Sequence, residues 1–235
     1  MCTVTVVASQ NKIIITSNRD EKTIRPAIEP KNYLINNQNI IFPKDPKAGG
    51  TWFAVSETGS VLVLLNGADE KHEVKLPYRR SRGLIVLDLI SSNSVKKSWH
   101  EINLDNIEPF TLVLFETNQL SQLRWDGSEK ETVDLTISKP HIWSSSTLYT
   151  KEIREQRVNW FQEFLNKNNS ISENEMFNFH KNTENQNTQN GLVINRNNEM
   201  KTLSITQSII ENNKITILHH DLIEQNHFST TFITI

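Results

Sequence analysis

The segment MCTVTVVASQNKIIITSNRDEK, residues 1–22, decides the fold. Two runs of β-branched and apolar residues, Thr3–Val7 and Ile13–Thr16, flank the polar segment Ser9–Lys12. Such runs, separated by a few polar residues, predict a β-hairpin. In an antiparallel hairpin the start of the first strand lies beside the end of the second. The pattern therefore brings Cys2 next to the polar residues that close the segment.

Cys2 is the only cysteine among the 235 residues, and it directly follows the initiator methionine. Methionine aminopeptidase tolerates a small second residue, so cleavage would leave an α-amine and a thiol on one residue. The amine has an unperturbed pKa of about 7.7–8.0, against about 8.5 for the thiol. It can accept the thiol's proton near neutral pH, as in enzymes with an N-terminal nucleophile. The alternative is a second-position cysteine that occurs by chance.

Three polar residues end the hairpin and give this cysteine a chemical setting. Asp20 can hold the α-ammonium, Arg19 can stabilise a thiolate or a substrate anion, and Asn18 can donate to an oxygen. The alternative is a solvated turn with a surface ion pair. The residues alone leave both interpretations open.

Composition and charge exclude several classes of protein. The formal charge of −2 gives no basic field for nucleic acid. A single cysteine excludes an internal disulfide framework. No run approaches the roughly 18 apolar residues of a membrane-spanning helix, and the apolar start lacks the basic region of a signal peptide. The sequence therefore predicts a soluble cytoplasmic protein with no integral membrane segment.

The order of patterns along the chain is strands, helices, strands, helices, strands. This order predicts an α+β protein of antiparallel sheets with helices packed outside them. No linker divides the chain, so residues 1–235 are interpreted as a single domain. Further strands are expected at Trp52–Ser56, Val61–Leu65, Phe110–Glu116, Leu120–Trp125, Thr132–Ile137, Gly191–Asn195, Thr202–Ser208, Lys214–His219 and Thr230–Ile235, and helices at Ser81–Ser92, Ser94–Ile102, Tyr149–Leu165 and Glu173–His180.

Three segments carry more specific expectations. Residues 22–50 contain four prolines and a Gly-Gly pair, so they are expected to be mostly ordered loop. The polar tract 182–190 is too poor in apolar residues to pack and is also expected to be a loop. Tyr149–Leu165 shows an apolar stripe, including Val158, opposite a charged face that includes Arg157.

The motif Asn18-Arg19-Asp20-Glu21 behind Met1-Cys2 resembles the signature of the NRDE family, which includes transport and Golgi organisation proteins. GGTWFAV (49–55), LLNGA (64–68), SRGLIVLDLI (81–90) and TLSITQSII (202–210) are similar to further blocks of that family. By resemblance the family is related to N-terminal nucleophile hydrolases of the choloylglycine hydrolase and penicillin V acylase group. The resemblance implies a four-layer α-β-β-α sandwich with Cys2 as nucleophile, Arg19 near the thiol and Asp20 at the α-amine.

The resemblance also implies an oxyanion-hole role for Asn66, which follows an apolar strand. An Asn-Gly hairpin turn is the alternative for Asn66 and Gly67. Ser144 or Ser145 stands where the hydrolases have a second asparagine, and their late arginine has no clear counterpart, with His227 near that position. These departures concern hydrolytic activity more than the fold.

A second group of residues completes the expected site. Trp52 and Trp143 fall in expected strands beside the implied pocket and could line it, with core packing as the default for both. The substrate-binding candidates are Asn18, Trp52, Trp143, Ser144 and Ser145, and the catalytic candidates are Cys2, Arg19, Asp20 and Asn66.

Other polar motifs give weaker signals. His219-His220-Asp221 could suggest a metal, but adjacent residues on a strand point to opposite faces, so a solvated strand end is expected. The basic cluster Tyr78-Arg79-Arg80 with Arg82 is expected to be the surface of a helix start. No cofactor and no metal are expected.

The sequence and the resemblance together predict hydrolysis or acyl transfer at an amide or thioester bond through acyl-Cys2. The alternative is a non-catalytic binding or trafficking protein for a hydrophobic ligand such as haem or lipid, because some relatives are associated with haem movement and with lipid or Golgi homeostasis. The expected partners are a small-molecule acyl substrate or that hydrophobic ligand, with no nucleic acid. A homo-oligomer is compatible with both interpretations.

Overall fold

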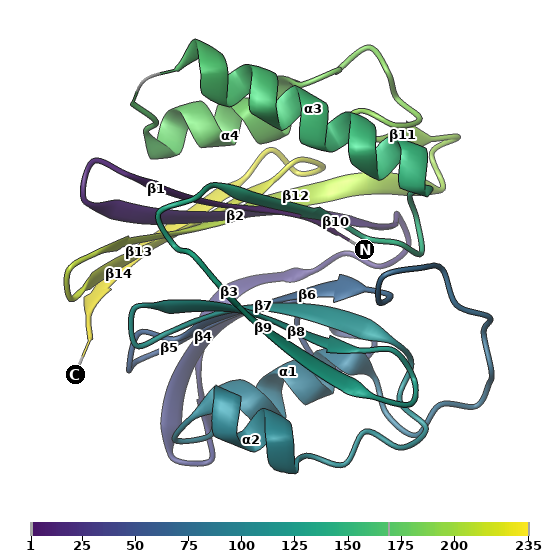
Figure 1. The fold of residues 1–235 in the computed structure, drawn as a ribbon, viewed down its shortest axis with the longest axis vertical. Helices are drawn as coiled ribbons and strands as arrows, with labels where there is room; N and C mark the ends of the chain where they lie inside the picture. Colours follow the sequence, from purple (N-terminus) through teal and green to yellow (C-terminus); the bar gives the residue numbers. More distant parts are fainter. Residues whose placement is uncertain (1, 169, 235) are drawn as a thin grey trace. The chain divides into compact units, whose positions relative to one another are not determined.

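The computed structural model describes residues 2–168 and 170–234, and of Cys2 the backbone alone. The chain forms two compact units, one of Met1–Pro26 and Ile137–Ile233 and the other of Ala27–Thr136 and Thr234–Ile235. Among the described residues, each unit carries a seven-stranded sheet and two helices (Figure 1). All strand pairings are antiparallel. The predicted α+β class with antiparallel sheets is therefore confirmed. The single-domain interpretation concerns how the two units sit together, and it stays a prediction.

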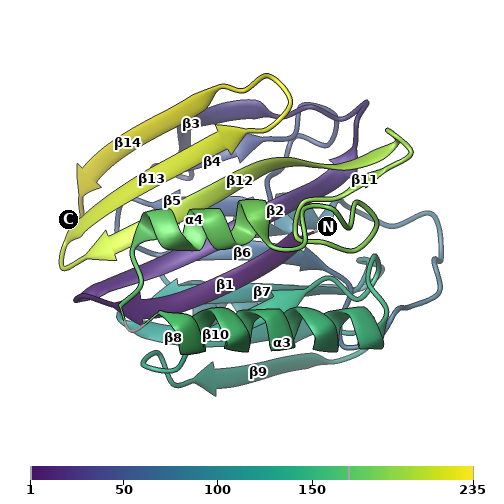
Figure 2. The same ribbon diagram turned by 90° about the horizontal axis from the view of Figure 1, so that it is seen from above.

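The first unit contains the amino-terminal hairpin at the centre of its sheet. The strand order is β10-β1-β2-β12-β13-β14, with β11 paired to β12. Helices α3 and α4 cross one face of this sheet (Figure 2). The elements are β1 (Cys2–Ser9), β2 (Lys12–Lys22), β10 (His141–Ser144), α3 (Lys151–Lys167), α4 (Glu173–Asn182), β11 (Asn195–Arg196), β12 (Met200–Glu211), β13 (Lys214–Asp221) and β14 (His227–Ile233).

The hairpin predicted from the opening segment is confirmed. Strands β1 and β2 pair from Ser9↔Lys12 back to Cys2↔Arg19. The connecting residues Gln10 and Asn11 have φ of 52° and 62°. Two positive φ values are typical of the type I′ turn, whose twist matches that of paired strands.

The helices bury an apolar cluster against this sheet. α4 begins with a capping box, because the Ser172 side chain accepts from the Glu175 backbone and the Glu175 side chain accepts from the Ser172 backbone. The Phe179 ring contacts the Phe161 ring of α3 at a centroid distance of 5.3 Å. The cluster consists of Val7, Ile14, Phe161, Ile171, Met176, Phe179 and Leu192.

The second unit is a meander of seven strands in chain order from β3 to β9. α1 packs on β5 and β6 and buries Ile85, Val86 and Leu89. The two helices of this unit, α1 and α2, begin directly after Ser81 and Ser94. The elements are β3 (Ile28–Ile35), β4 (Gln38–Lys44), β5 (Phe53–Ser56), β6 (Val61–Asn66), α1 (Arg82–Ile90), α2 (Val95–Glu101), β7 (Phe110–Glu116), β8 (Gln119–Trp125) and β9 (Lys130–Leu135).

The expectation of a loop over residues 22–50 is wrong, because β3 and β4 lie within it. Strand β3 is at the sheet edge, where a proline such as Pro30 leaves no ladder hydrogen bond unmade. The turn between the strands consists of Asn36 and Asn37, whose φ values of 49° and 63° again indicate a type I′ turn. Asparagine tolerates this conformation, and that signal outweighs the proline count.

Two further expectations need correction. The strand expected at Gly191–Asn195 is reduced to Asn195–Arg196, because Leu192 is buried in the apolar cluster with residues of α3 and α4 and is not paired in the sheet. On α3 the expected faces are partly inverted. Arg157 is fully buried, whereas Val158 is 37% exposed. The tract 182–190 is a loop after the first residue, as predicted.

Two glycine-containing blocks of the second unit touch through their backbones. A Cβ on Gly50 would lie 2.3 Å from the carbonyl carbon of Gly83. A Cβ on Gly83 would lie 2.9 Å from the Thr51 nitrogen. The Thr51 amide donates to the Gly83 carbonyl at 3.1 Å, which joins the loop before β5 to the start of α1. Glycine is needed at both positions because a side chain would prevent this approach.

We predict that Gly50→Ala lowers the free energy of unfolding by about 1–3 kcal/mol or more, because the opposing atoms are backbone and cannot move aside alone. Urea denaturation followed by tryptophan fluorescence measures the effect. Lys47→Ala, on an exposed residue of the same loop, is the control and should change stability by less than about 0.5 kcal/mol. A Gly50→Ala protein as stable as the parent would contradict the close approach.

Candidate active site

The candidate site begins with the register of the first two strands. Cys2 pairs with Arg19, and Thr3 pairs with Asn18. On its other side β2 pairs with β12, so Arg19 lies opposite Ser204. The register therefore places the Cys2 backbone directly beside the polar motif. The Cys2 side chain and Met1 lie outside the described residues.

The polar motif is buried, so the solvated-turn interpretation is wrong. Asn18 and Asp20 are fully buried, and Arg19 is 3% exposed. Asn18 Nδ2 donates to the carbonyls of His180 at 3.2 Å and Leu192 at 2.6 Å, on the helix side of the sheet. Because side chains alternate along a strand, Arg19 points to the opposite face. Arg19 Nη1 donates to the Arg25 carbonyl at 2.9 Å.

Asp20 is held by two hydroxyl groups on the helix side. The Tyr149 hydroxyl donates to Asp20 Oδ2 at 2.7 Å, and Thr202 Oγ1 donates to Asp20 Oδ1 at 2.6 Å. Burial raises the pKa of Tyr149 well above its ordinary value, and the Asp20 charge adds to the rise. Tyr149 therefore keeps its proton and acts as a donor. Short bonds from hydroxyl groups to a carboxylate are among the stronger hydrogen bonds in proteins.

Arg157 supplies a buried positive charge next to this pair. Its guanidinium carbon lies 3.6 Å from the centroid of the Tyr149 ring. The guanidinium donates to Thr3 Oγ1 and to the backbone carbonyls of Asn190 at 3.1 Å and Gly191 at 2.5 Å. A buried charge with this many partners avoids the cost of an unpaired one. Its surroundings in the sequence are polar, so no local signal predicted this burial.

His180 completes the network on the helix side. Its Nδ1 lies 2.5 Å from Asn18 Oδ1, and its Nε2 lies 2.8 Å from Thr5 Oγ1. Because Asn18 Oδ1 can only accept, the proton of the neutral ring is on Nδ1, and Thr5 donates to Nε2. Burial, with a smaller contribution from Arg157, lowers the pKa of His180 to about 3. His180 is therefore neutral and serves to fix Asn18.

The opposite face of the same sheet carries a second polar group around Arg19. Ser17 and Thr206 are paired, and Thr206 Oγ1 lies 2.8 Å from Nδ1 of His219. His219 is 4% exposed, so the expectation of a solvated strand end is wrong for this residue. Burial lowers its pKa to about 4. The described residues contain no group of side chains suited to hold a metal ion.

Three serine hydroxyls on this Arg19 face are buried without a hydrogen-bond partner among the described residues: Ser17, Ser204 and Ser208. Ser204 lies opposite Arg19, and Ser208 lies opposite Ile15. Ser17 was not a site candidate, and Ser204 and Ser208 lie in TLSITQSII (202–210), a block that carries the family resemblance but was not predicted to belong to the site. The alternation of small polar residues at every second position of β12 (Ser204, Thr206 and Ser208) was the signal in the sequence that could have predicted a polar face of this strand.

Strand β10 adds the candidates from the middle of the chain. Trp143 pairs with Val4, which places it on the Arg19 face, whereas Ser144 pairs with Thr3. The Ser144 hydroxyl lies 3.3 Å from Thr3 Oγ1. Ser145 is 1% exposed, and its hydroxyl lies 3.0 Å from Thr147 Oγ1. The structure thus groups Trp143 with Arg19, and Ser144 with the helix-side network.

Asn66 and Trp52 belong to the other unit. Asn66 is the last residue of β6, and Gly67 after it has φ of 85°. The Asn-Gly pair is no hairpin turn, because the chain continues into a long segment that contains α1 and α2. Trp52, 6% exposed, directly precedes β5. Their position relative to Cys2 stays a prediction.

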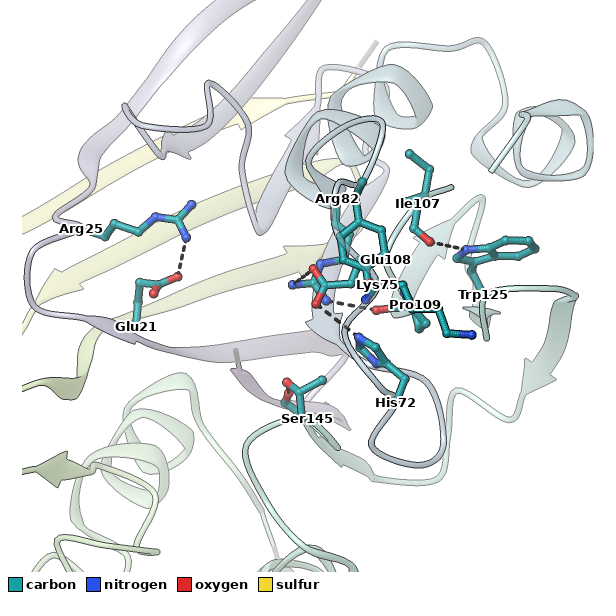
Figure 3. A network of polar contacts seen from close by, with 12 residues as sticks. Glu21, Arg25, His72, Lys75, Arg82, Ile107, Glu108, Pro109, Trp125 and Ser145 are labelled. Atoms are coloured by element: carbon teal, nitrogen blue, oxygen red, sulfur yellow. Dashed lines mark hydrogen bonds and ion pairs between the residues drawn. The ribbon is translucent and has the colours of Figure 1, made fainter. Parts of the chain in front are cut away.

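The basic cluster near residue 80 is engaged in local contacts. Arg82 pairs with Glu108 at 2.9 Å, and Glu108 also contacts His72 Nε2 at 3.2 Å (Figure 3). Arg80 pairs with Asp88 at 2.7 Å, and Arg79 donates to the Asn103 carbonyl at 2.6 Å. These contacts tie the start of α1 to the segment before β7. They agree with the predicted helix-start surface.

Comparisons with known proteins place this geometry in context. The family model described as "TANGO2: Transport and Golgi organisation 2" matches residues 1–235. No curated protein sequence matches the chain. In the described residues no helix is long and apolar enough to cross a membrane.

Solved structures share the fold at low sequence identity. A variant of conjugated bile acid hydrolase from Clostridium perfringens has a TM-score of 0.63 at 10% identity, over 97% of this chain and 92% of the other. A Caenorhabditis elegans orthologue of N-acylethanolamine-hydrolyzing acid amidase has a TM-score of 0.61 at 13% identity, over 88% of this chain and 92% of the other. At these identities the likeness shows the fold alone, and it agrees with the N-terminal nucleophile hydrolase-like fold that the family resemblance implied.

We predict that stability falls as the pH drops below about 6.5, because His180 and His219 bind protons more readily when unfolded. Both histidines have a lower pKa in the folded protein than in the unfolded chain. The free energy of unfolding is therefore highest above pH 6.5, where both states hold the neutral ring, and it falls as the pH drops toward the folded-state pKa. Each histidine can contribute up to about 1.4 kcal/mol per pH unit. Urea denaturation at pH 7.5, 6.5 and 5.5 measures the slope.

His180→Asn should reduce this pH slope, because it removes the titrating ring and keeps an amide that can donate to Asn18. His100→Asn, on an exposed histidine, is the matched control and should leave the slope unchanged. An equal slope in the parent and in His180→Asn would contradict the assignment of a buried neutral ring.

Proposed function

Since the chain belongs to the transport and Golgi organisation 2 family, we propose that it is an N-terminal cysteine hydrolase or acyltransferase that acts through acyl-Cys2. The bond cleaved is an amide or a thioester. The observation that carries the proposal is the pairing of Cys2 with Arg19. The residue after Arg19 is Asp20, whose carboxylate accepts hydrogen bonds from two hydroxyl groups. The names of the two kinds of solved structure, a hydrolase and an amidase, support the same reaction class.

The two faces of the sheet divide the proposed chemistry. Residues opposed in an antiparallel pair share a face, so the proposed position of the Cys2 thiol is beside the Arg19 guanidinium. That charge lowers the pKa of a neighbouring thiol by stabilising the thiolate. Once Met1 is removed, the terminal amine is the α-nitrogen of Cys2 itself, at the start of β1, where Cys2 pairs with Arg19 of β2. The proposed partner of the α-ammonium is Asp20.

The proposed reaction balances its protons on the terminal amine. The amine takes the thiol proton, and the sulfur attacks the substrate carbonyl carbon. As the tetrahedral intermediate collapses, the ammonium returns the proton to the departing amine or thiolate. Water then attacks the carbonyl carbon of acyl-Cys2 and gives a proton to the amine. The carbon–sulfur bond breaks, the acid leaves, and the ammonium returns its proton to the Cys2 thiolate. Asn66 is proposed as an oxyanion donor, a role that contributes about 2.7–4 kcal/mol where it has been tested.

The substrate in this proposal lies against the Arg19 face. Trp143 and Val4 are apolar residues of that face, and Ser17 carries a hydroxyl on it; Val4 and Ser17 are fully buried. Asn18 forms three hydrogen bonds on the helix side, so its proposed contribution is to hold the motif rather than to contact substrate. The alternative, a protein that binds a hydrophobic ligand without turnover, requires no activated thiol.

We predict that iodoacetamide alkylates Cys2 at pH 7 at least about tenfold faster in the parent than in Arg19→Gln, because a neighbouring cation increases the thiolate fraction. The chain has one cysteine, so mass spectrometry of total alkylation reports this thiol alone. Arg80→Gln, on an exposed arginine, is the control and should react like the parent. Equal rates in the parent and Arg19→Gln would favour the binding protein.

The proposal also requires removal of Met1, because a peptide-bonded nitrogen cannot act as a base. We predict that intact-mass analysis of native material shows a species lighter by one methionine that begins at Cys2. Cys2→Ala, which keeps a small second residue, is the control for processing and should be trimmed in the same way. Quantitative retention of Met1 in the parent would sink the nucleophile hypothesis.

A further inference from the structure

Tyr149 is the central residue of a buried network of polar contacts that no motif predicted. It precedes α3 and is 1% exposed. Its hydroxyl donates to Asp20 of β2, and its ring lies against the guanidinium of Arg157 from α3. The Arg196 guanidinium lies 5.5 Å from the same ring centroid. One side chain thus joins a carboxylate to two cations from distant parts of the chain.

The contacts leave the Tyr149 ring little freedom. Arg157 is anchored by Thr3 Oγ1 and by two backbone carbonyls, so its planar group is a fixed platform for the ring. The Tyr149 amide donates to the Ser145 carbonyl at 3.1 Å, which fixes the backbone. With ring and backbone both held, the hydroxyl has one direction, and that direction is Asp20 Oδ2.

We infer that Tyr149 is a positioning residue that holds the Asp20 carboxylate beside the terminal amine of processed Cys2. This inference rests on the proposed function, in which Asp20 is the partner of that amine. Thr202 holds the second carboxylate oxygen, so Tyr149 and Thr202 together fix the carboxylate plane. A carboxylate fixed next to an ammonium favours the charged form and raises the amine pKa above about 7.7–8.0.

The other charged groups around Tyr149 do not change charge in this pH range. Arg157 from α3 and Arg196 from β11 stay protonated, as arginine does in proteins. His180 from α4, which contacts the adjacent Asn18, has a pKa of about 3 and stays neutral. Arg19 and Glu21 flank Asp20 on β2, and alternation directs them to the other face. A titration between pH 6 and 10 at this position therefore reports the terminal amine and the thiol.

The test measures the pKa of the Cys2 amine by NMR on protein labelled with ¹³C,¹⁵N-cysteine, which gives one residue signal. The thiol is first blocked by iodoacetamide so that the amine alone titrates. In Tyr149→Phe we expect the amine pKa to fall by about 0.5 or more, because the ring remains and the bond that orients Asp20 is lost. Tyr33→Phe, whose ring stacks on Phe42 in the other unit, is the matched control and should leave the amine pKa unchanged.

The outcomes distinguish the positioning role of Tyr149 from the contact between Asp20 and the terminal amine that the proposed function requires. If Asp20→Asn lowers the amine pKa and Tyr149→Phe leaves it unchanged or raises it, the positioning role is overturned and the proposed function stands. If neither variant moves the amine pKa, the contact between Asp20 and the amine fails, and the proposed function fails in that part. A lower melting temperature with an unchanged pKa marks Tyr149 as structural only. Should Tyr149→Phe fail to fold, Thr202→Val, which removes the other donor, gives the same expected fall.

Discussion

The antiparallel pairing of β1 with β2 is the constraint on which the candidate site depends. Its register sets Cys2 opposite Arg19 and Thr3 opposite Asn18. Because side chains alternate, the same register sends Asn18 and Asp20 to the helices and Arg19 to the other face. A slip of one residue would exchange these faces and place a guanidinium beneath the helices. The type I′ turn at Gln10 and Asn11 fixes the register by its length.

The helix face shows what this arrangement requires of the rest of the unit. Buried Asp20, Arg157 and His180 would each be costly without partners. The structure supplies those partners from segments far apart in the chain, and each polar group on this face that is named above has at least one. Such networks depend on all their members, so α3, α4 and β12 hold the amino-terminal strands through polar contacts as well as through the apolar cluster.

The fold by itself does not establish a reaction, because one fold supports many chemistries. The solved structures at 10% and 13% identity show the architecture alone. The site supports the proposed chemistry, because the cysteine at position 2 pairs with buried Arg19 and the carboxylate of the next residue, Asp20, is held by two hydroxyl groups. One departure from the hydrolase pattern lies at Ser144 and Ser145, whose hydroxyls contact Thr3 and Thr147; the other is the late arginine, near whose position His227 begins β14. The Ser144 contact belongs to the network that holds Asp20.

The sequence by itself determined the elements whose signals are local. Alternation and turn residues predicted the hairpin of β1 and β2, and the helices expected at Ser81–Ser92 and Ser94–Ile102 begin directly after Ser81 and Ser94. The family motif selected Cys2 and the residues 18–20. Local patterns also misled where they met tertiary packing. The prolines of residues 22–50 predicted a loop, but β3 forms an edge strand there. The polar residues around Arg157 in the sequence predicted an exposed side chain, but Arg157 is fully buried.

Only the tertiary structure decided which side chains meet. Tyr149 and Asp20 are 129 residues apart, and Thr202 and Asp20 are 182 apart, so no periodicity could pair them. The same holds for His219, which is 4% exposed and whose Nδ1 lies 2.8 Å from Thr206 Oγ1 of the neighbouring strand β12. Secondary structure follows from forces that act over a few residues. The site follows from the burial of polar groups, and burial is a property of the assembled fold.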